Sequence, residues 1–267
     1  MVVDGKKIAA QLERRLALGI EEAGSNPHLA VIMVGSDPAS EVYVRKKQEA
    51  AERVGIRFDL HHFLAGVPEE KVFDLLDRLN ADPDVHGIII QLPLPRQLDI
   101  DALVNYVAPW KDVDGLGGAA EFISPTARAV LEILQRRKVS LKGKHAVVVG
   151  AGRVAGLPVA SVLVQEGATV TVCQIHTRNL KSHTKRAEIL VSAAGRPGLI
   201  TRSHVKNGAV VIDVGISRKN GRICGDVDPA VEPVSRFITP VPGGVGPITV
   251  AKLLENTYTA SQIKNIE

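Results

Sequence analysis

The chain has 267 residues, 45% of them hydrophobic and 23% charged, which is enough for one large domain or two small ones and typical of a soluble globular protein. A net charge of +4 without a long basic run argues against a nucleic-acid-binding arm and suits an anionic small substrate or cofactor. Cys173 and Cys224 lack metal-ligand spacing and fit a reducing compartment. Because there is no signal-peptide layout and no apolar run of about 18 residues, we expect a cytoplasmic protein without a membrane partner.

The first half of the chain alternates expected helices and strands. Apolar residues at helical spacing indicate the helices, and continuous apolar runs indicate strands that are buried on both faces. This alternation is typical of an α/β fold with a parallel sheet, in which ligands bind outside the carboxyl ends of the strands. The expected helices are residues 4–23, 37–55, 68–80 and 99–107, and the expected strands are residues 29–34, 56–63 and 85–91.

Tyr43 and Lys47 lie four residues apart in a helix that Asp37 can cap and Pro38 can begin, so they share one face of that helix. An aromatic ring and an amine on one face can stack a flat ligand and move a proton beside it. The same pair also fits an ordinary amphipathic helix whose lysine extends its amine to solvent.

Two polar positions lie on expected loops or strand ends. Gln91 closes an apolar strand, where it acts either as a strand-end cap or as a site residue, and two prolines stiffen the chain after it. Asp114 stands immediately before Gly115, which is the pattern of a turn or of a carboxylate presented on a loop. Spacing alone does not separate these interpretations.

A helix expected over residues 124–137 leads into a second α/β unit. Its first strand, 144–149, is followed by the glycine-rich stretch Gly150-Ala-Gly152-Arg-Val-Ala-Gly156 and by a helix over 157–166. Glycines permit a tight turn and let backbone N–H groups approach a diphosphate at a helix N-terminus. A dinucleotide site on a Rossmann-like parallel sheet is therefore predicted. The sheet continues with a strand at 168–173 and strand-to-loop junctions at 188–195 and 209–215.

The last distinctive stretch is residues 239–247, which precede a helix expected over 249–263. Three prolines and three glycines in nine residues specify a rigid loop. Such a loop is either a domain linker or a ligand contact, and the cost of specifying so much backbone favours the ligand contact.

Four motifs together resemble the bifunctional methylenetetrahydrofolate dehydrogenase/cyclohydrolase family in its compact bacterial and archaeal form. They occur in the family's order and cover nearly the whole chain, and the last of them is very specific. The motifs are Ala39-Ser40-x-x-Tyr43-Val44-x-x-Lys47, Gly87-x-x-x-Gln91-Leu-Pro-Leu-Pro95, Pro109-x-Lys111-Asp-Val-Asp-Gly115 and Thr239-Pro-Val-Pro-Gly-Gly-Val-Gly-Pro247.

The resemblance implies two α/β domains around a cleft. Residues 1–120, completed by a C-terminal helix over 249–267, would bind folate and carry catalysis. Residues 121–248 would form a Rossmann-like domain that binds NADP and usually forms the homodimer interface. The implied substrates are tetrahydrofolate derivatives. A hydride passes from 5,10-methylenetetrahydrofolate to NADP, and the resulting 5,10-methenyl cation is hydrolysed to 10-formyltetrahydrofolate.

The resemblance also implies roles for single residues. Lys47 would be the general acid/base of hydrolysis, assisted by Gln91, while Tyr43 stacks the folate and Asp114 orients the pterin. The expected substrate contacts are Tyr43, Lys47, Gln91, Leu92, Asp114, Pro242, Gly243 and Gly244. The expected cofactor contacts are Gly150, Gly152, Arg153, Val154, Ile175, His176, Arg178, Ala194, Gly195, Gly215 and Ile216. No metal site is expected, because no His, Cys or carboxylate residues have ligand spacing.

Two positions depart from the family's pattern. Ala151 and Ile175 replace the arginine and the serine that would face the 2′-phosphate of NADP. No Asp or Glu stands at the end of the second strand of this domain to bind the ribose of NAD. Arg153 and Arg178 remain, and arginine suits a phosphate. We therefore predict a modest preference for NADP through one of these arginines, with NAD used less efficiently.

Three alternatives remain open from the sequence. The protein could be a dehydrogenase that lacks the cyclohydrolase step, although Lys47 and Gln91 are both present. It could be a non-catalytic dinucleotide-binding sensor, which would not require Tyr43, Lys47, Gln91 and Asp114 together. A dehydrogenase of shikimate type would not explain the proline-rich loop before the last helix.

Overall fold

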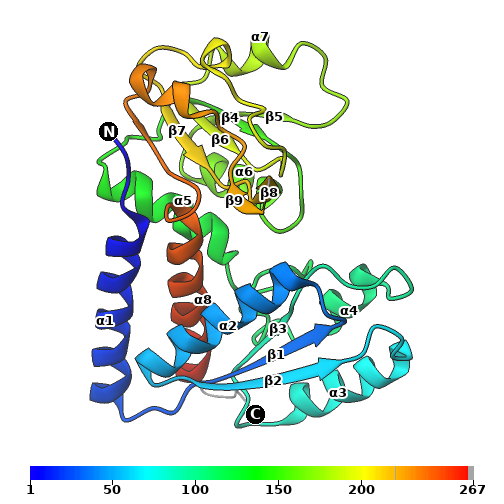
Figure 1. Ribbon diagram of the computed structural model, residues 1–267. Helices are drawn as coiled ribbons and strands as arrows, with labels where there is room; N and C mark the ends of the chain where they lie inside the picture. The colour runs from blue at the N-terminus through cyan, green and yellow to red at the C-terminus, as the bar shows by residue number, and fades with distance from the viewer. Residues whose placement is uncertain (220, 264–267) are drawn as a thin grey trace. The chain divides into compact units, whose positions relative to one another are not determined.

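The computed structural model describes residues 1–219 and 221–263, and the chain forms two compact units (Figure 1). The β1 unit comprises residues 10–125 and the chain from Val250, and the β4 unit comprises residues 1–9 and 126–249. Each unit contains a parallel sheet with helices, which confirms the predicted α/β class. The division into a folate domain and a dinucleotide domain at residue 120 stays a prediction.

The β1 unit is built on a three-stranded parallel sheet in the order β2-β1-β3, with β1 in its centre. All of β1 is buried, as its continuous apolar run predicts. Alternate β1 side chains point to opposite faces, so one set packs against α1, α2 and α8 and the other against α3 and α4. The elements are α1 (Gly5–Ala23), β1 (His28–Val34), α2 (Pro38–Val54), β2 (Arg57–Phe63), α3 (Glu69–Ala81), β3 (Gly87–Ile90), α4 (Ile100–Tyr106) and α8 (Val245–Gln262).

Local sequence determines both ends of α2. The carboxylate of Asp37 accepts a hydrogen bond of 2.8 Å from the backbone N–H of Ser40, and Pro38 is the first helical residue. Gly55 ends the helix in the left-handed conformation, with φ of 82°, which glycine adopts without strain. The predicted helix and its cap are therefore confirmed, and Tyr43 and Lys47 lie on it one turn apart.

The β4 unit holds a five-stranded parallel sheet in the order β10-β7-β6-β4-β5. After β4 the chain adds β5 on one side and β6 on the other, so the strand order reverses at β4, where doubly wound folds bind their ligands. The elements are α5 (Pro125–Arg136), β4 (His145–Val149), α6 (Gly156–Gln165), β5 (Thr169–Cys173), α7 (Leu180–Thr184), β6 (Ile189–Ser192), η1 (Arg202–His204), β7 (Val210–Asp213), η2 (Pro229–Val234) and β10 (Phe237–Ile238). An antiparallel hairpin, β8 (Ser217–Lys219) and β9 (Arg222–Cys224), follows β7.

Two expected boundaries are corrected by the structure. Helix α8 begins at Val245 rather than at residue 249. Pro247 then lies in the first turn, where a helix makes no hydrogen bond through the backbone N–H that proline lacks. Strand β3 ends at Ile90 rather than at Gln91. The backbone N–H of Gln91 still donates to Ile32 over 2.8 Å, so its place beside β1 is fixed. Hydrophobic periodicity did not reveal α7, β10 or the β8–β9 hairpin.

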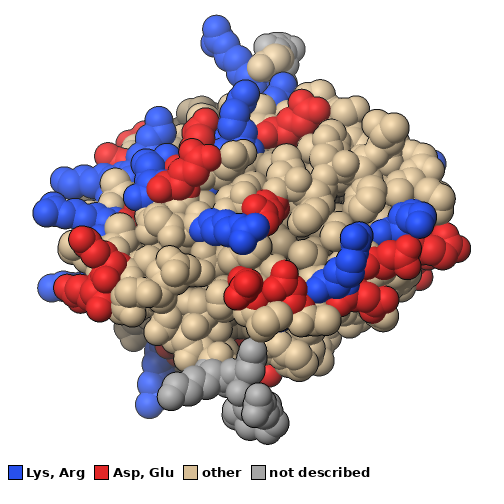
Figure 2. All heavy atoms as spheres, turned by 90° about the horizontal axis from the view of Figure 1, so that it is seen from below, with Lys and Arg blue, Asp and Glu red and all other residues tan. Residues whose placement is uncertain are grey.

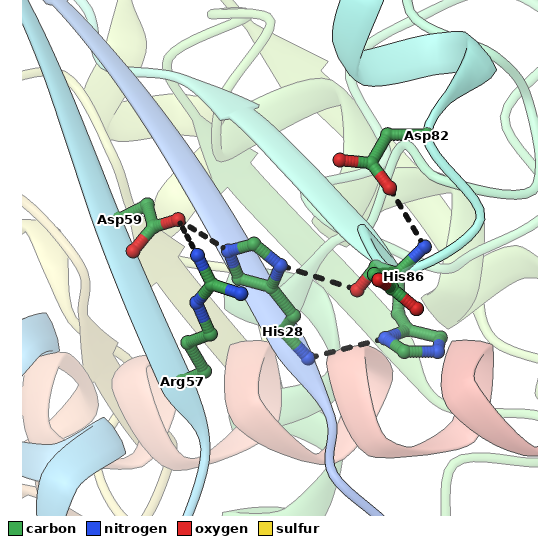
Figure 3. A network of polar contacts seen from close by, with 6 residues as sticks. His28, Arg57, Asp59, Asp82 and His86 are labelled. Atoms are coloured by element: carbon green, nitrogen blue, oxygen red, sulfur yellow. Dashed lines mark hydrogen bonds and ion pairs between the residues drawn. The ribbon is translucent and has the colours of Figure 1, made fainter.

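A polar network joins the amino ends of β1, β2 and β3 (Figure 3). Nε2 of the buried His28 lies 2.9 Å from the carboxylate of Asp59, to which Arg57 donates over 2.8 Å. The backbone N–H of His28 donates to His86 over 3.2 Å. Burial alone would raise the pKa of Asp59, but His28 and Arg57 beside it lower that pKa below its ordinary value. The network satisfies His28 at the end of the sheet opposite to the predicted site.

Surface charge, helix hydropathy and possible metal ligands can be compared with the partners expected from the sequence. Lys and Arg side chains lie interspersed with Asp and Glu on the face of the molecule seen in Figure 2. In the part of the chain that the structure describes, no helix has both the length and the apolar character needed to cross a membrane. Within residues 1–219 and 221–263, no three His, Cys, Asp or Glu side chains are grouped so as to hold a metal ion.

Candidate functional site

Lys47 and Gln91 meet at the carboxyl ends of β1 and β3. Lys47 extends from the third turn of α2, and its amine donates a hydrogen bond of 3.0 Å to Oε1 of Gln91. The amide nitrogen of Gln91 donates to the carbonyl of Leu92 over 2.7 Å, so both ends of the Gln91 side chain are held. Ser40 also donates to Leu92 over 3.4 Å, which ties the start of α2 to the same segment. The amine is thereby held in one direction.

The carboxylate of Asp114 lies close enough to Lys47 for their charges to interact. Burial lowers the pKa of the Lys47 amine, and the charge of Asp114 opposes this effect. Burial likewise raises the pKa of Asp114, and the charge of Lys47 opposes it. Burial prevails for both groups, so each is shifted toward its neutral form. A lysine with a lowered pKa can exchange protons closer to neutral pH than an exposed one.

Tyr43 lies one turn before Lys47 on α2, and it is partly buried. Burial raises the pKa of the Tyr43 phenol, so the side chain stays a neutral ring with a hydroxyl group. The structure therefore brings Tyr43, Lys47, Gln91 and Asp114 to one end of the sheet of the β1 unit. Their contacts with a substrate stay a prediction.

Three polar side chains that sequence reasoning did not select hold the loop that carries Asp114. The buried Lys111 donates to the carbonyls of Leu79 and Asp82 over 2.9 and 2.6 Å, at the end of α3. The buried Asp112 accepts from the backbone N–H groups of residues 115, 116 and 117. Asn256 of α8 donates to the carbonyl of Val113 over 2.8 Å. Lys111 and Asp112 belong to the Lys-Asp-Val-Asp-Gly motif, and their place in this motif beside Asp114 could have identified them from the sequence.

In the β4 unit, the glycine-rich stretch connects β4 to α6. Gly150 has φ of 105°, and a Cβ there would overlap the carbonyl of Ala193, so the position requires glycine. A Cβ at Gly156 would overlap the carbonyl of Gly150, while the space before Gly152 is open. Helix α6 begins at Gly156 without a side-chain cap. The N–H of Leu157 donates to the carbonyl of Gly152 over 3.1 Å and Pro158 has no N–H, so the first turn offers few backbone donors. The open space at Gly152 is what suits a diphosphate here.

The other predicted cofactor residues follow the carboxyl ends of neighbouring strands. Val149, Cys173, Ser192 and Asp213 are the last residues of β4, β5, β6 and β7 and stand in register across the sheet. The loops that follow them therefore lie next to one another. They carry Arg153 and Val154 after β4, Ile175, His176 and Arg178 after β5, Ala194 and Gly195 after β6, and Gly215 and Ile216 after β7.

The side chains on the loop after β5 point outward. Ile175 is 90% exposed at the tip of a turn that Gln174 and Thr177 close by hydrogen bonds of 2.8 and 2.9 Å. His176 and Arg178 are also exposed, whereas Arg153 is partly buried. The structure thus places Arg153 and Arg178 on the loops after two adjacent strands, β4 and β5. Which of them contacts a phosphate stays a prediction.

Residues 239–244 form a tight loop in the β4 unit. Gly243 has φ of 100°, and its carbonyl accepts a hydrogen bond of 2.9 Å from the backbone N–H of Gly5. A Cβ at Gly5 would overlap the carbonyl of Gly244, so the loop and the start of α1 are in direct backbone contact. The predicted substrate residues Pro242, Gly243 and Gly244 belong to this loop, and their role stays a prediction.

Comparison with known proteins covers both units. The family model described as "Tetrahydrofolate dehydrogenase/cyclohydrolase, catalytic domain" matches residues 3–114, and the model of the NAD(P)-binding domain of the same family matches residues 124–265. The bifunctional protein FolD of Halalkalibacterium halodurans is 46% identical, over 98% of this chain and 99% of its own length.

Solved structures agree with these matches. The bifunctional enzyme FolD of Campylobacter jejuni, a methylenetetrahydrofolate dehydrogenase/cyclohydrolase, superimposes with a TM-score of 0.94 at 39% identity, covering 98% of each chain. FolD of Trypanosoma brucei, solved with NADP cofactor and inhibitor, has a TM-score of 0.94 at 36% identity, covering 98% of this chain and 97% of that one. Family models over both halves and such identity over nearly the full length show that the chain belongs to the tetrahydrofolate dehydrogenase/cyclohydrolase family.

Proposed function

We infer that the protein oxidises 5,10-methylenetetrahydrofolate with NADP and hydrolyses the resulting 5,10-methenyltetrahydrofolate to 10-formyltetrahydrofolate. The observation that carries this inference is the hydrogen bond of 3.0 Å between Lys47 and Gln91, beside Asp114, in a chain of this family. A dehydrogenase without the hydrolytic step, or a non-catalytic dinucleotide sensor, has no need for a half-buried lysine whose amine is hydrogen-bonded to a glutamine.

The two reactions make different demands on the protein. NADP accepts the hydride, and the loss of hydride leaves a delocalised cation on the one-carbon bridge, so this step needs position rather than an acid. In our proposal Tyr43 stacks the folate and Asp114 accepts hydrogen bonds from the pterin. Since burial raises the pKa of Asp114, a donor group of the pterin would restore its charged form.

Hydrolysis requires several proton transfers. Water adds to the cationic carbon and loses a proton to leave a hydroxyl group. As the ring opens, the hydroxyl loses its proton to become the formyl carbonyl and one ring nitrogen gains a proton, so one proton is released overall. We assign these transfers to Lys47, because burial already lowers its pKa and a cationic intermediate beside it would lower that pKa further. Gln91 keeps the amine aimed, because its own amide is fixed by Leu92.

Our first prediction is that Lys47→Met abolishes methenyl hydrolysis while hydride transfer is impaired less, because only hydrolysis requires a proton carrier. Loss of general acid/base assistance costs roughly 10²–10⁴-fold. The assay records NADPH formation and methenyltetrahydrofolate together. Lys46→Met, which removes an exposed amine from the same helix, is the matched control and should leave both rates unchanged. Wild-type hydrolysis in Lys47→Met would refute the assignment.

We further propose that NADP is the preferred cofactor, with the 2′-phosphate contacted by Arg153 or Arg178. The related enzyme of Trypanosoma brucei was solved with NADP, which supports this choice. In this chain both arginines follow adjacent strands of the sheet. No acidic residue between Val170 and Ile175 would repel a phosphate.

The second prediction is that Arg153→Ala or Arg178→Ala lowers kcat/KM for NADP but leaves kcat/KM for NAD nearly unchanged, because NAD lacks the 2′-phosphate. Losing a charge-assisted contact costs roughly 10–100-fold. Arg186→Ala removes the same charge just before β6, at the opposite end of the sheet, and serves as the control. An NADP preference that survives both arginine substitutions, or a wild-type preference for NAD, would overturn the proposal.

We also propose that two copies associate through α6 and β5. No charged residue occurs between Gly156 and Gln165, and Leu157 and Val164 on one face of α6 are 51% and 57% exposed. Strand β5 ends the sheet, with Val172 40% exposed. An open sheet edge beside an apolar helix face is suited to a second copy of the chain. The free thiols of Cys173 and Cys224 fit the reducing cytoplasm in which we expect this dimer to work.

The third prediction is that the wild-type protein is a dimer in solution and that Val164→Glu is a monomer, because the new carboxylate would lose its hydration in the interface. Light scattering after gel filtration gives the mass of each variant. Leu64→Glu places the same charge on an exposed leucine of the β1 unit and should remain dimeric. A monomeric wild type, or a dimeric Val164→Glu, would contradict this interface.

A further inference from the structure

Two buried aspartates in the β4 unit have no role in the proposed chemistry. Asp213 ends β7 and is 2% exposed, and Asp226 follows β9 and is fully buried. Both carboxylates accept their hydrogen bonds mainly from backbone N–H groups. Four of those N–H groups, of residues 194, 195, 196 and 215, belong to the loops that carry the predicted cofactor residues after β6 and β7, and the other two, of residues 226 and 227, follow β9.

Asp226 holds the loop after β6. Its carboxylate accepts from the backbone N–H groups of Ala194, Gly195 and Arg196 over 2.7, 3.3 and 2.6 Å, and from the hydroxyl of Ser192 over 2.9 Å. Successive N–H groups that converge on one anion form a nest, a loop shape that the anion stabilises. Ala194 and Gly195 are predicted cofactor contacts, so Asp226 determines the backbone conformation there.

Asp213 links this loop to its neighbours. Its carboxylate accepts from the N–H groups of Gly215, Asp226 and Val227 over 3.0, 3.1 and 2.9 Å. It therefore fixes the loop after β7, at Gly215, and also the segment that presents Asp226. The backbone N–H of Asp213 donates to the hydroxyl of Thr239 over 2.7 Å, at the start of the loop that contains Gly243.

Glycines let the chain approach both carboxylates. A Cβ at Gly215 would overlap the carboxylate of Asp226, and a Cβ at Gly225 would overlap that of Asp213. Burial, assisted by the charge of Asp226, raises the pKa of Asp213 to about 6 in spite of its three N–H donors. Two buried carboxylates side by side cost free energy, so stability alone does not account for the pair.

We propose that Asp213 and Asp226 are positioning residues of the dinucleotide site, which fix the loops after β6 and β7 in the spacing that a bound dinucleotide requires. They act through the backbone of Ala194, Gly195 and Gly215 and touch no reacting atom. This inference rests on the proposed function, because it assumes that these loops bind NADP. It assigns to the pair a contribution to cofactor affinity rather than to hydrolysis.

The fourth prediction is that Asp226→Asn weakens NADP binding roughly 10–100-fold, because one carboxylate oxygen becomes an NH₂ group that faces backbone donors. Fluorescence titration or calorimetry gives the dissociation constant. Hydrolysis of added methenyltetrahydrofolate needs no dinucleotide and should stay near the wild-type rate. Asp228→Asn is the matched control, because the Asp228 carboxylate accepts from the N–H of Ala230 at the start of η2, and NADP affinity of this variant should not change.

A second variant keeps both aspartates. Gly225→Ala displaces the Asp213 carboxylate and should also weaken NADP binding while hydrolysis continues. Wild-type affinity for NADP in both Asp226→Asn and Gly225→Ala would overturn the inference. So would an equal loss of NADP binding and hydrolysis together with a lowered melting temperature, because that result would indicate a purely structural pair. If the wild-type protein itself did not bind NADP, the proposed function would fail instead.

Discussion

The proposed chemistry depends on one constraint, a half-buried lysine amine that is hydrogen-bonded to a neutral acceptor. Lys47 donates to Gln91, and the burial that surrounds the amine disfavours its charge. The carboxylate of Asp114 offsets this penalty only in part. An amine with those neighbours is easier to deprotonate than an exposed lysine, and that property is what a hydrolytic step at neutral pH requires.

The same geometry of parallel strands positions the predicted ligand contacts in both units. Parallel strands in register bring the loops at their carboxyl ends together, and in both units those loops carry the predicted ligand contacts. Buried polar side chains then fix these loops through hydrogen bonds. Asp112 and Asn256 do this for the loop of Asp114, and Asp226 does it for the loop of Ala194. Buried polar side chains thus fix loop segments that belong to no helix or strand.

Much of the architecture could be predicted because local rules decided it. The cap at Asp37, the stop at Gly55 and the apolar run of β1 each have one good structural solution. The start of α8 was misplaced because prolines and glycines fit a first helical turn as well as a loop. Asp226 could not be selected, because its importance comes from backbone groups about 30 residues away that only the folded chain brings to it.

The most direct test of this account is the pKa of Lys47, measured by NMR titration of the ε-carbons in lysine-labelled protein, with the signal assigned by its absence in Lys47→Met. The account predicts a pKa below the ordinary lysine value of about 10.4. It also predicts a still lower pKa in Asp114→Asn, because the carboxylate that favours the charged amine is gone. An ordinary pKa in both proteins would contradict the account.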